Sequence, residues 1–375
     1  MSALEVHARV RHRDAQFELS LDDGDVVAVL GPNGAGKSTL LSLIAGLLRP
    51  DDGRIALGET VVTDTAAGLF VRPHARGVAM LAQQALLFPH MSVAANVAYA
   101  PRCQGQSRSQ AHAAAQRWLQ AVDAEHLADR RPAQLSGGQA QRIAIARALA
   151  AQPRVLLLDE PMAALDVTAA PAIRRLLRTV LRAERRTAVI VTHDLLDVLA
   201  LANKVVVIER GRITESGPVR DILASPRSDF AARIAGVNLI SGVVCEPGMI
   251  TTSWGAAVSG LGDTDVDAAA VALFSPTAVS VHLDSPHGSP RNSLPVRIAE
   301  MEVHGSTVRI RGGEQPDGSP GLAADITAAA AADLDLTPGR DAYFVVKAQE
   351  VRLLPALAPP FTGVSPVPRD PPGRR

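Results

Sequence analysis

The chain has 375 residues, enough for two domains of ordinary size, and it is 47% hydrophobic and 20% charged, as expected of a globular protein with a full core. Its 38 basic residues balance 38 acidic ones, which excludes a global field that would recruit nucleic acid or an anionic membrane. Any anion site must therefore be local.

Few features suggest export or a membrane span. Cys103 and Cys245 lie far apart without metal-ligand spacing, which favours ordinary thiols in a reducing compartment. The charged N-terminus contains no apolar core of a signal peptide. The uncharged stretch from Val78 to Pro101 is interrupted by polar residues such as Gln83 and His90, so it does not predict a span. We expect a cytoplasmic chain, with any membrane spans supplied by another protein.

Residues 1–230 have the pattern of an α/β domain. Apolar, β-branched runs at 25–31, 154–161 and 187–194 are each followed by helical sequence, which predicts a mostly parallel sheet covered on both faces. Residues 203–217 read as a hairpin with its turn at Gly211. Between about 84 and 152 the chain is Ala-rich and helical without strands, which predicts a helical subdomain inserted into the α/β core.

The sequence pattern changes after Ile234. Short strand-like runs separated by Gly, Pro, Ser and Asp clusters predict a small all-β domain, a barrel or sandwich, over 237–355. Residues 356–375 are Pro-rich and predict a disordered tail.

The stretch 31–39, GPNGAGKST, satisfies the phosphate-loop pattern G-x4-G-K-[ST], with an apolar run before it and a helical pattern after it. Glycines let backbone N–H groups converge on phosphate oxygens, and the helix adds its positive end. Lys37 can reach the β- and γ-phosphates, and the Ser38 hydroxyl can ligate Mg²⁺. The alternative is a Gly-rich turn that matches by chance. The candidate nucleotide-binding residues here are Gly31, Pro32, Asn33, Gly34, Ala35, Gly36, Lys37, Ser38 and Thr39.

An acidic pair follows the second apolar run. Asp159 at its end can hold the water shell of Mg²⁺, and Glu160 is placed to polarise the attacking water as a general base. Alone, such a pair could equally cap a helix. The phosphate loop upstream favours the catalytic interpretation.

Three further motifs go beyond a generic phosphate-loop ATPase. Residues 134–142, QLSGGQAQR, place Ser136, Gly137, Gly138 and Gln139 before a helix, so this segment could receive a γ-phosphate. A single chain needs no second such pocket, whereas two chains arranged head to tail would complete each other's sites. Asp166 follows the acidic pair, and His193 ends another strand as a candidate sensor of the γ-phosphate. Taken singly, a solvated Asp in a turn and a His at a strand end are the simpler explanations.

The order of these motifs, with LAQQALLFPH between the first two, resembles that of the ATP-binding cassette ATPases of transporters, over about residues 1–226. The resemblance implies a head-to-tail homodimer that clamps two ATP molecules between the phosphate loop of one chain and Ser136–Gln139 of the other. It implies that Gln83 senses Mg²⁺ and the lytic water, so that Ser38, Gln83 and Asp159 form the metal site. The segment through His90 is similar to the surface that receives a permease's coupling helix.

One departure concerns adenine. The family often stacks the base on Tyr or Trp in the first strand region, and here the aromatic residue before the phosphate loop is Phe17. It is a candidate for stacking, and an inward core residue of an amphipathic strand is the alternative.

In the C-terminal region the runs LFSPTAVSVH, GSPRNSLPVRI and FVVKAQEV begin at Leu273, Gly288 and Phe344. With these runs, residues 237–354 resemble the small OB-like, Mop/TOBE-like regulatory β-domain attached to ATPases of molybdate importers. Arg291 offers a donor fork, Ser289 a hydroxyl and Lys347 a point charge to a tetrahedral oxyanion, and Asn292 belongs to the same S-x-R-N pattern. Pro290 lacks an N–H donor, which removes one possible contact. A turn with solvated basic residues, in a domain that only regulates or braces a dimer, is the alternative.

These expectations combine into one function. The resemblance implies an ATPase, with ATP and Mg²⁺ as cofactors, that energises molybdate import from the cytoplasmic face of the cell membrane as a peripheral subunit. It implies a transmembrane permease as partner and an exported substrate-binding protein as an indirect partner. The balanced charge and the lack of a recognisable nucleic-acid module predict no nucleic-acid partner. The alternatives are import of sulfate, tungstate, ferric iron or a sugar, an oxyanion-sensing regulator, or a soluble ATPase of translation or repair.

Overall fold

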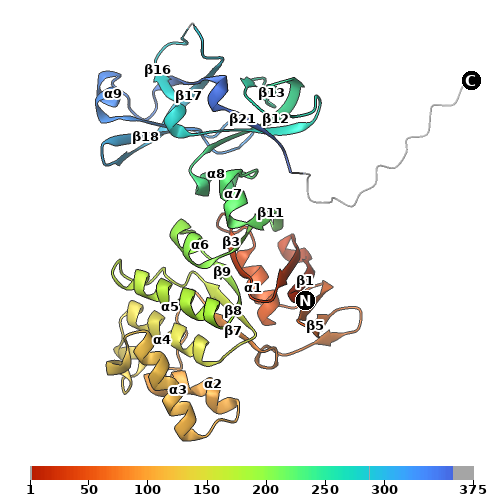
Figure 1. Ribbon diagram of the computed structural model, residues 1–375, viewed down its shortest axis with the longest axis vertical. Helices are drawn as coiled ribbons and strands as arrows, with labels where there is room; N and C mark the ends of the chain where they lie inside the picture. The colour runs from red at the N-terminus through yellow and green to blue at the C-terminus, as the bar shows by residue number, and fades with distance from the viewer. Residues whose placement is uncertain (1, 287, 358–375) are drawn as a thin grey trace, which may run out of the picture.

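A computed structural model describes residues 2–286 and 288–357 (Figure 1). Nearly all of the predicted Pro-rich tail, 358–375, lies outside the described residues. Within the described ranges, no helix has both the length and the apolar character needed to cross a membrane.

The N-terminal half is built on one eleven-stranded sheet with the order β6-β5-β4-β1-β2-β11-β10-β3-β9-β8-β7. Its strands are β1 (Ser2–Val10), β2 (Ala15–Asp22), β3 (Val26–Leu30), β4 (Asp52–Leu57), β5 (Thr60–Asp64), β6 (Leu69–Phe70), β7 (Val78–Leu81), β8 (Val155–Asp159), β9 (Thr187–Val191), β10 (Lys204–Glu209) and β11 (Arg212–Pro218). Strands β10, β3, β9, β8 and β7 pair in parallel, as the apolar runs predicted. The β10–β11 hairpin turns at Arg210 and Gly211, which confirms the predicted hairpin.

Helices pack around the sheet of this half (Figure 1). They are α1 (Lys37–Ala45), α2 (Val93–Cys103), α3 (Arg108–Ala121), α4 (Gly137–Ala150), α5 (Ala169–Ala183), α6 (Leu195–Leu201), α7 (Val219–Ala224) and α8 (Asp229–Ala235). Helices α2, α3 and α4 follow one another between β7 and β8 with no strand among them, and they lie at the lower end of Figure 1. Ser92, Ser107 and Ser136 cap their N-termini by accepting a backbone N–H.

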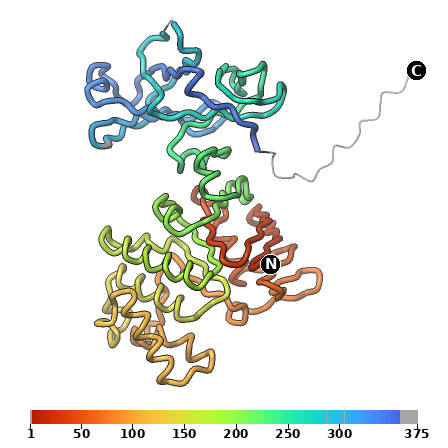
Figure 2. The backbone as a smooth tube through the Cα atoms, viewed as in Figure 1, coloured from red at the N-terminus to blue at the C-terminus, as the bar shows by residue number. Residues whose placement is uncertain are grey.

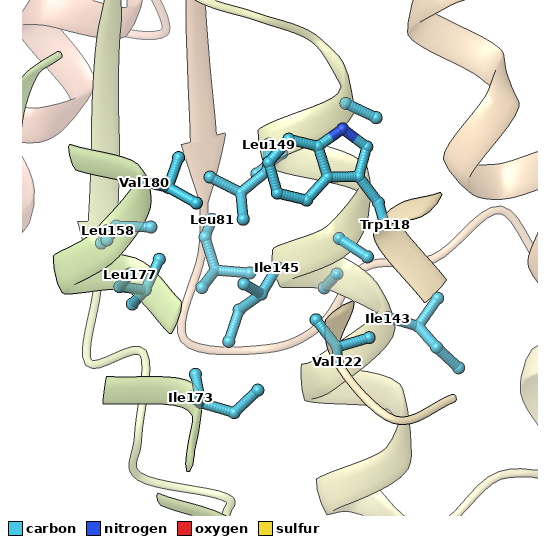
Figure 3. Close-up of a cluster of buried hydrophobic side chains, with 14 of the residues drawn as sticks. Leu81, Trp118, Val122, Ile143, Ile145, Leu149, Leu158, Ile173, Leu177 and Val180 are labelled. Atoms are coloured by element: carbon cyan, nitrogen blue, oxygen red, sulfur yellow. The ribbon is translucent and has the colours of Figure 1, made fainter. Parts of the chain in front are cut away.

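A shared apolar core joins these helices to the sheet. Trp118 of α3 and Ile145 of α4 belong to the same buried cluster as Leu158 of β8 and Leu177 of α5 (Figure 3). Ala144, Ala146, Ala148 and Ala150 of α4 are buried and let the helix pack closely on its neighbours. This packing fixes the C-terminal end of β8, where the acidic pair follows.

In its described residues the C-terminal half is all-β apart from the short α-helix α9 (Ala328–Asp333) and two 3-10 turns. Two five-stranded sheets, with orders β14-β13-β12-β15-β21 and β16-β20-β17-β18-β19, enclose one hydrophobic cluster that includes Phe274 and Phe344. The strands are β12 (Asn238–Glu246), β13 (Met249–Thr251), β14 (Ala257–Ser259), β15 (Ala269–Phe274), β16 (Ser280–His282), β17 (Asn292–His304), β18 (Thr307–Gly312), β19 (Ala323–Thr327), β20 (Asp341–Val346) and β21 (Arg352–Pro355). The predicted fold class, α/β followed by a small all-β unit, is therefore confirmed.

Helices α7 and α8 lie between the two halves, in the green segment of Figure 2. Helix α8 is held to the α/β half, because the Phe230 N–H donates to Glu209 at 3.1 Å and the Ser228 hydroxyl donates to Glu215 at 2.8 Å. It ends at Gly236, and β12 begins two residues later. Arg352 of β21 returns a contact by donating to the Ser225 hydroxyl at 2.7 Å.

Candidate active site

The loop between β3 and α1 lets the backbone approach a ligand closely. Gly34 and Gly36 have φ angles of 78° and 108°, in the left-handed region that glycine enters at little cost. A Cβ on Gly34 would meet no atom within 4 Å, so this part of the loop borders open space. Helix α1 begins at Lys37 with no side-chain cap, which leaves its first-turn N–H groups for an anion.

A cavity of about 400 Å³ lies over this loop. It is lined by Asn33, Gly34, Gly36, Lys37, Ser38, Thr39, Gln83, Asp159, Glu160 and Val191. The fold thus brings the phosphate loop, the residue after β7 and the acidic pair after β8 to one place. Such convergence at the carboxyl ends of parallel strands is where open α/β sheets bind ligands.

Lys37 is held at the loop by its own backbone. Its ammonium donates to the carbonyls of Gly31 at 2.7 Å and Pro32 at 2.8 Å. Burial lowers the pKa of Lys37, while the carboxylates of Glu160 and Asp159 act in the opposite direction. An entering phosphate can therefore replace two carbonyl acceptors with anionic oxygens, a stronger partner for the ammonium.

Three predicted loop residues support the cavity without lining it. Gly31 packs so close to β10 that a Cβ would lie 2.1 Å from the Ile208 carbonyl oxygen. Pro32 contributes the carbonyl that Lys37 uses. Ala35 is buried, and its carbonyl accepts the Gly211 N–H at 2.9 Å. The loop is thereby fixed to the β10–β11 hairpin.

The acidic pair, Asp159 and Glu160, lies at the end of β8, where Asp159 is partly buried and Glu160 has a strained backbone. Burial and then the neighbouring Glu160 raise the pKa of Asp159, and Lys37 lowers it. Glu160 has a φ of 47°, a left-handed conformation that costs a non-glycine residue roughly 1–3 kcal/mol. The Glu160 N–H donates to the Val191 carbonyl at 2.9 Å, which holds this conformation against β9. Strain of this kind clusters at functional sites.

Two predicted catalytic side chains meet on the Glu160 carboxylate. Gln83 Nε2 donates to Glu160 Oε2 at 3.3 Å. His193 Nδ1 lies 3.6 Å from Glu160 Oε1, with 74% of the His193 side chain exposed. The structure therefore joins residues that follow β7, β8 and β9 around one carboxylate.

The loop that carries His193 is held in place by hydrogen bonds from helix α5. Arg174 of α5 donates to Asp197 at 2.6 and 2.8 Å and to Asp194 at 3.1 Å. Asp197 is buried and also accepts the Thr192 hydroxyl at 2.9 Å. Helix α5 therefore positions the loop between β9 and α6.

Ser136, Gly137, Gly138 and Gln139 do not line the cavity of their own chain. Ser136 and Gln139 form a reciprocal capping box at the exposed start of α4. Gly138 lies beside the 162–166 segment, since a Cβ there would be 3.2 Å from the Ala164 carbonyl oxygen. Asp166 accepts the Ala169 N–H at 2.8 Å and hydrogen bonds to Thr168, and these bonds hold the pKa of Asp166 below its ordinary value. Asp166 thus caps α5 outside the cavity.

The stacking role predicted for Phe17 is wrong. Phe17 is 1% exposed in the core beneath the phosphate loop, and its ring lies 3.2 Å from where a Cβ on Gly36 would be. No ring face remains for a base. A residue that the sequence did not single out, Arg13, instead reaches the loop and donates to Thr39 Oγ1 at 3.0 Å.

The oxyanion role predicted for Asn292 is also wrong. Asn292 is fully buried, with its Oδ1 accepting the Ser259 N–H at 2.7 Å and its Nδ2 donating to the Ser259 carbonyl at 2.9 Å. Its amide joins β17 to β14 and is fully engaged. Ser289, Arg291 and Lys347 are exposed, and the pairing of Asn292 with Val346 brings Arg291 and Lys347 to the same end of β17 and β20.

Comparison with known proteins places these features in a family. The family model described as ABC transporter matches residues 15–163, and the TOBE domain model matches residues 288–353. Over 362 residues the chain is 54% identical to the molybdenum import ATP-binding protein ModC of Mycobacterium tuberculosis, an alignment that covers 95% of this chain and 98% of that protein. The chain belongs to the ABC transporter family.

Other ABC transporter proteins match over a shorter span. The putative 2-aminoethylphosphonate import ATP-binding protein PhnT of Salmonella typhimurium is 39% identical, over 64% of this chain and 66% of that protein. The sulfate/thiosulfate import ATP-binding protein CysA of Bradyrhizobium diazoefficiens is 40% identical, over 62% and 67%. A dimeric post-hydrolysis structure of the ATP-binding cassette MJ0796 bound to ADP and Pi aligns with a TM-score of 0.50 at 27% identity, covering 58% of this chain and 99% of that one.

Arg13 and Arg174 are the functional candidates that sequence reasoning missed. Arg13 stands in a run of charged residues with no motif around it, and Arg174 is one of several arginines on an amphipathic helix. Neither position carries a local signal. Only the fold places Arg13 against Thr39 and Arg174 against the His193 loop.

Proposed function

We propose that this chain is the ATP-hydrolysing subunit of an importer that takes up molybdate through a membrane permease. The observation that carries the proposal is the 54% sequence identity to the ModC protein, which extends along nearly the whole of both chains and includes the C-terminal domain. The partial matches to PhnT and CysA make import of 2-aminoethylphosphonate or sulfate the second candidate. We assign residues 1–230 to the ATPase domain, with a helical subdomain at about 84–152, and 237–355 to the regulatory domain.

ATP binds in the cavity over the phosphate loop. The glycine backbone and the N-terminus of α1 hold the phosphates, and Lys37 exchanges its loop carbonyls for phosphate oxygens. Ser38, Gln83 and Asp159 line the same cavity with hydroxyl, amide and carboxylate oxygens, the hard donors that suit Mg²⁺. Bound Mg²⁺ would neutralise charge on the phosphates.

Glu160 is the general base. Its carboxylate lines the cavity next to Asp159 and is steadied by Gln83, so it can accept a proton from a water that attacks the terminal phosphate. His193 touches the same carboxylate and is largely exposed, which leaves it free to contact the terminal phosphate. Products are ADP and phosphate.

The active unit is a head-to-tail homodimer. Ser136–Gln139 lie at an exposed helix N-terminus outside their own chain's cavity, so they can contact the nucleotide of a second copy. Asp166 belongs to the 162–166 segment beside Gly138 and also lies outside the cavity of its own chain. ATP then closes the dimer and hydrolysis reopens it, because only the closed state binds the γ-phosphate from both sides.

The permease contacts the segment around residues 84–100. Leu86 is 65% exposed and Tyr99 is 42% exposed, an apolar surface open to a partner helix. The segment is not loose, since Arg147 of α4 donates to the Leu86 carbonyl at 3.0 Å and lies over the Phe88 ring. The chain thereby works at the cytoplasmic membrane face as a peripheral subunit, and an exported binding protein delivers substrate from the other side.

Ser289, Arg291 and Lys347 remain candidates for an oxyanion contact in the regulatory domain, now without Asn292. They lie at one end of the β17–β20 pair and are exposed.

Reconstitution tests this function. The chain and its permease are placed in lipid vesicles, and ATP hydrolysis is measured with molybdate-loaded or sulfate-loaded binding protein at the outer face. We expect molybdate-loaded protein to stimulate hydrolysis. Stimulation by the sulfate-loaded protein alone would make sulfate the substrate.

A further inference from the structure

A second cavity lies at the junction of the two halves, far along the chain from the phosphate loop. It is formed by α8, by the start of β12 and by the β18–β19 pair, and we call it the junction pocket. Asp229 and Arg233 line it from the α/β side, and Arg309, Arg311 and Gly321 line it from the β side. Both halves of the molecule are therefore needed to form it.

The volume of the junction pocket selects its ligand. Its volume is about 40 Å³. One ordered water needs roughly 10–15 Å³ by this measure, so the space suits a few waters or one small polyatomic ion. Sites for nucleotides and drug-sized molecules need roughly 300 Å³ or more, which excludes them here.

The charge of the pocket favours an anion. Arg309 is already paired with Asp325 through two hydrogen bonds of 2.6 and 2.7 Å. The guanidinium groups of Arg233 and Arg311 have no hydrogen bond or ion pair to any other residue in the described ranges. Arg233 is exposed and Arg311 is half-buried at the lining of this small cavity, and two such donor forks match the oxygens of a tetrahedral oxyanion.

Among the described residues that line the pocket, Asp229 is the one with an acidic side chain. Burial, then Glu209 and Asp317, raise the pKa of Asp229, and Arg210 lowers it. Leu239 and Leu322 are buried at the pocket wall, and this apolar surface makes electrostatic attraction inside stronger than at an open surface.

The walls of the junction pocket are rigid. The buried Asn238 amide exchanges two hydrogen bonds with the Ala323 backbone, at 2.7 and 2.8 Å, and so ties β12 to β19. Gly321 passes so close to Gly312 that a Cβ would lie 1.8 Å from the Gly312 carbonyl oxygen. The donors are therefore presented from a fixed frame, which lowers the entropy lost on binding.

We propose that the junction pocket binds a small tetrahedral oxyanion of the molybdate, sulfate and phosphate class, held by Arg233 and Arg311 between the ATPase and regulatory halves. This site is distinct from Ser289, Arg291 and Lys347, and it does not depend on the transport role. The pocket is connected to the phosphate loop through hydrogen bonds. Phe230 of α8 donates to Glu209, and the nearby Gly211 N–H donates to the Ala35 carbonyl in the loop.

The test measures binding of sodium molybdate, sodium sulfate and sodium phosphate to the full chain by isothermal titration calorimetry, without nucleotide or permease. We expect saturable binding of at least one oxyanion at one site per chain. Arg311→Gln and Arg233→Gln should each weaken it about tenfold or more, the loss of one charge-assisted contact. Asp229→Asn should not weaken it. The order of affinities identifies the source, with molybdate first for a transported substrate and phosphate first for a metabolic signal.

The matched control is Arg291→Gln, which removes an exposed guanidinium from the same β-domain. It should leave binding unchanged. Loss of binding in Arg291→Gln with full binding in Arg311→Gln would place the anion at the β17–β20 end and overturn the proposal. So would the absence of saturable binding by all three oxyanions. Far-UV circular dichroism of each variant keeps a folding defect from counting as a binding defect.

Discussion

Gln83 donates a hydrogen bond to Glu160 across a sequence separation of 77 residues, with Nε2 and Oε2 3.3 Å apart. Glu160 is therefore steadied over the phosphate loop, in a backbone conformation that costs energy to hold. A carboxylate in this position, beside Asp159 and Lys37, is suited to take a proton from water next to a terminal phosphate.

Glu160→Gln should lower kcat for ATP hydrolysis by about 10²–10⁴-fold, the usual contribution of a general base, because the amide cannot accept the proton. ATP binding should persist, since the phosphate loop is unchanged, and the nucleotide-bound dimer should accumulate. Steady-state phosphate release and size-exclusion chromatography with ATP measure both effects. Glu18→Gln, at an exposed β2 carboxylate, is the control and should turn over normally. Normal turnover in Glu160→Gln would remove Glu160 from the mechanism.

Arg13→Gln should raise KM for ATP several-fold while leaving kcat nearly unchanged. Because Arg13 donates to Thr39 Oγ1, the Thr39 hydroxyl proton stays free to donate to a phosphate oxygen. Losing this arrangement affects binding rather than chemistry. Arg9→Gln, at an exposed position of β1, serves as the matched variant. A kcat effect with unchanged KM would contradict this assignment.

Phe17→Leu should leave KM for ATP unchanged and lower stability by roughly 1 kcal/mol, because a buried ring is exchanged for a smaller apolar side chain. Chemical denaturation measures the stability, and ATP titration measures the affinity. Marked weakening of ATP binding with unchanged stability would restore a stacking role for Phe17.

Asp25→Asn should destabilise the fold by about 1–3 kcal/mol at neutral pH, the range for a buried charge-assisted hydrogen bond. Burial alone would raise the pKa of Asp25, but hydrogen bonds from Lys204, Asn203 and the Asp22 N–H outweigh it and hold that pKa below its ordinary value. This network fixes the start of β3, the strand that leads into the phosphate loop.

The pH dependence of that effect has a definite sign. Because the folded pKa of Asp25 is depressed, its stabilisation is fully present above the unfolded pKa, about 3.9, and is lost as pH falls through the folded pKa. The difference between wild type and Asp25→Asn, measured by urea denaturation, should therefore close in acid. Asp23→Asn, at an exposed neighbour, should show no such difference. A gap that widens in acid would contradict the role of the network.

The sequence predicted the parts of this molecule that depend on local pattern. The buried strands, the phosphate loop and the acidic pair follow from runs and spacings within a few residues, and the structure brings them into one cavity. Phe17 and Asn292 were misjudged because their environment is set by distant segments, the loop above Phe17 and the β14 backbone beside Asn292. Arg13, Arg174 and the junction pocket depend wholly on tertiary contacts.

The central claim is that ATP hydrolysis by this chain drives molybdate uptake. The most direct measurement is uptake of labelled molybdate by a strain that lacks the chain, complemented with wild type or with Glu160→Gln, with sulfate uptake followed in parallel. We predict that wild type restores molybdate uptake, that Glu160→Gln does not, and that sulfate uptake is the same in all strains. Equal loss of sulfate and molybdate uptake in the deletion strain, or full molybdate uptake with Glu160→Gln, would contradict the account.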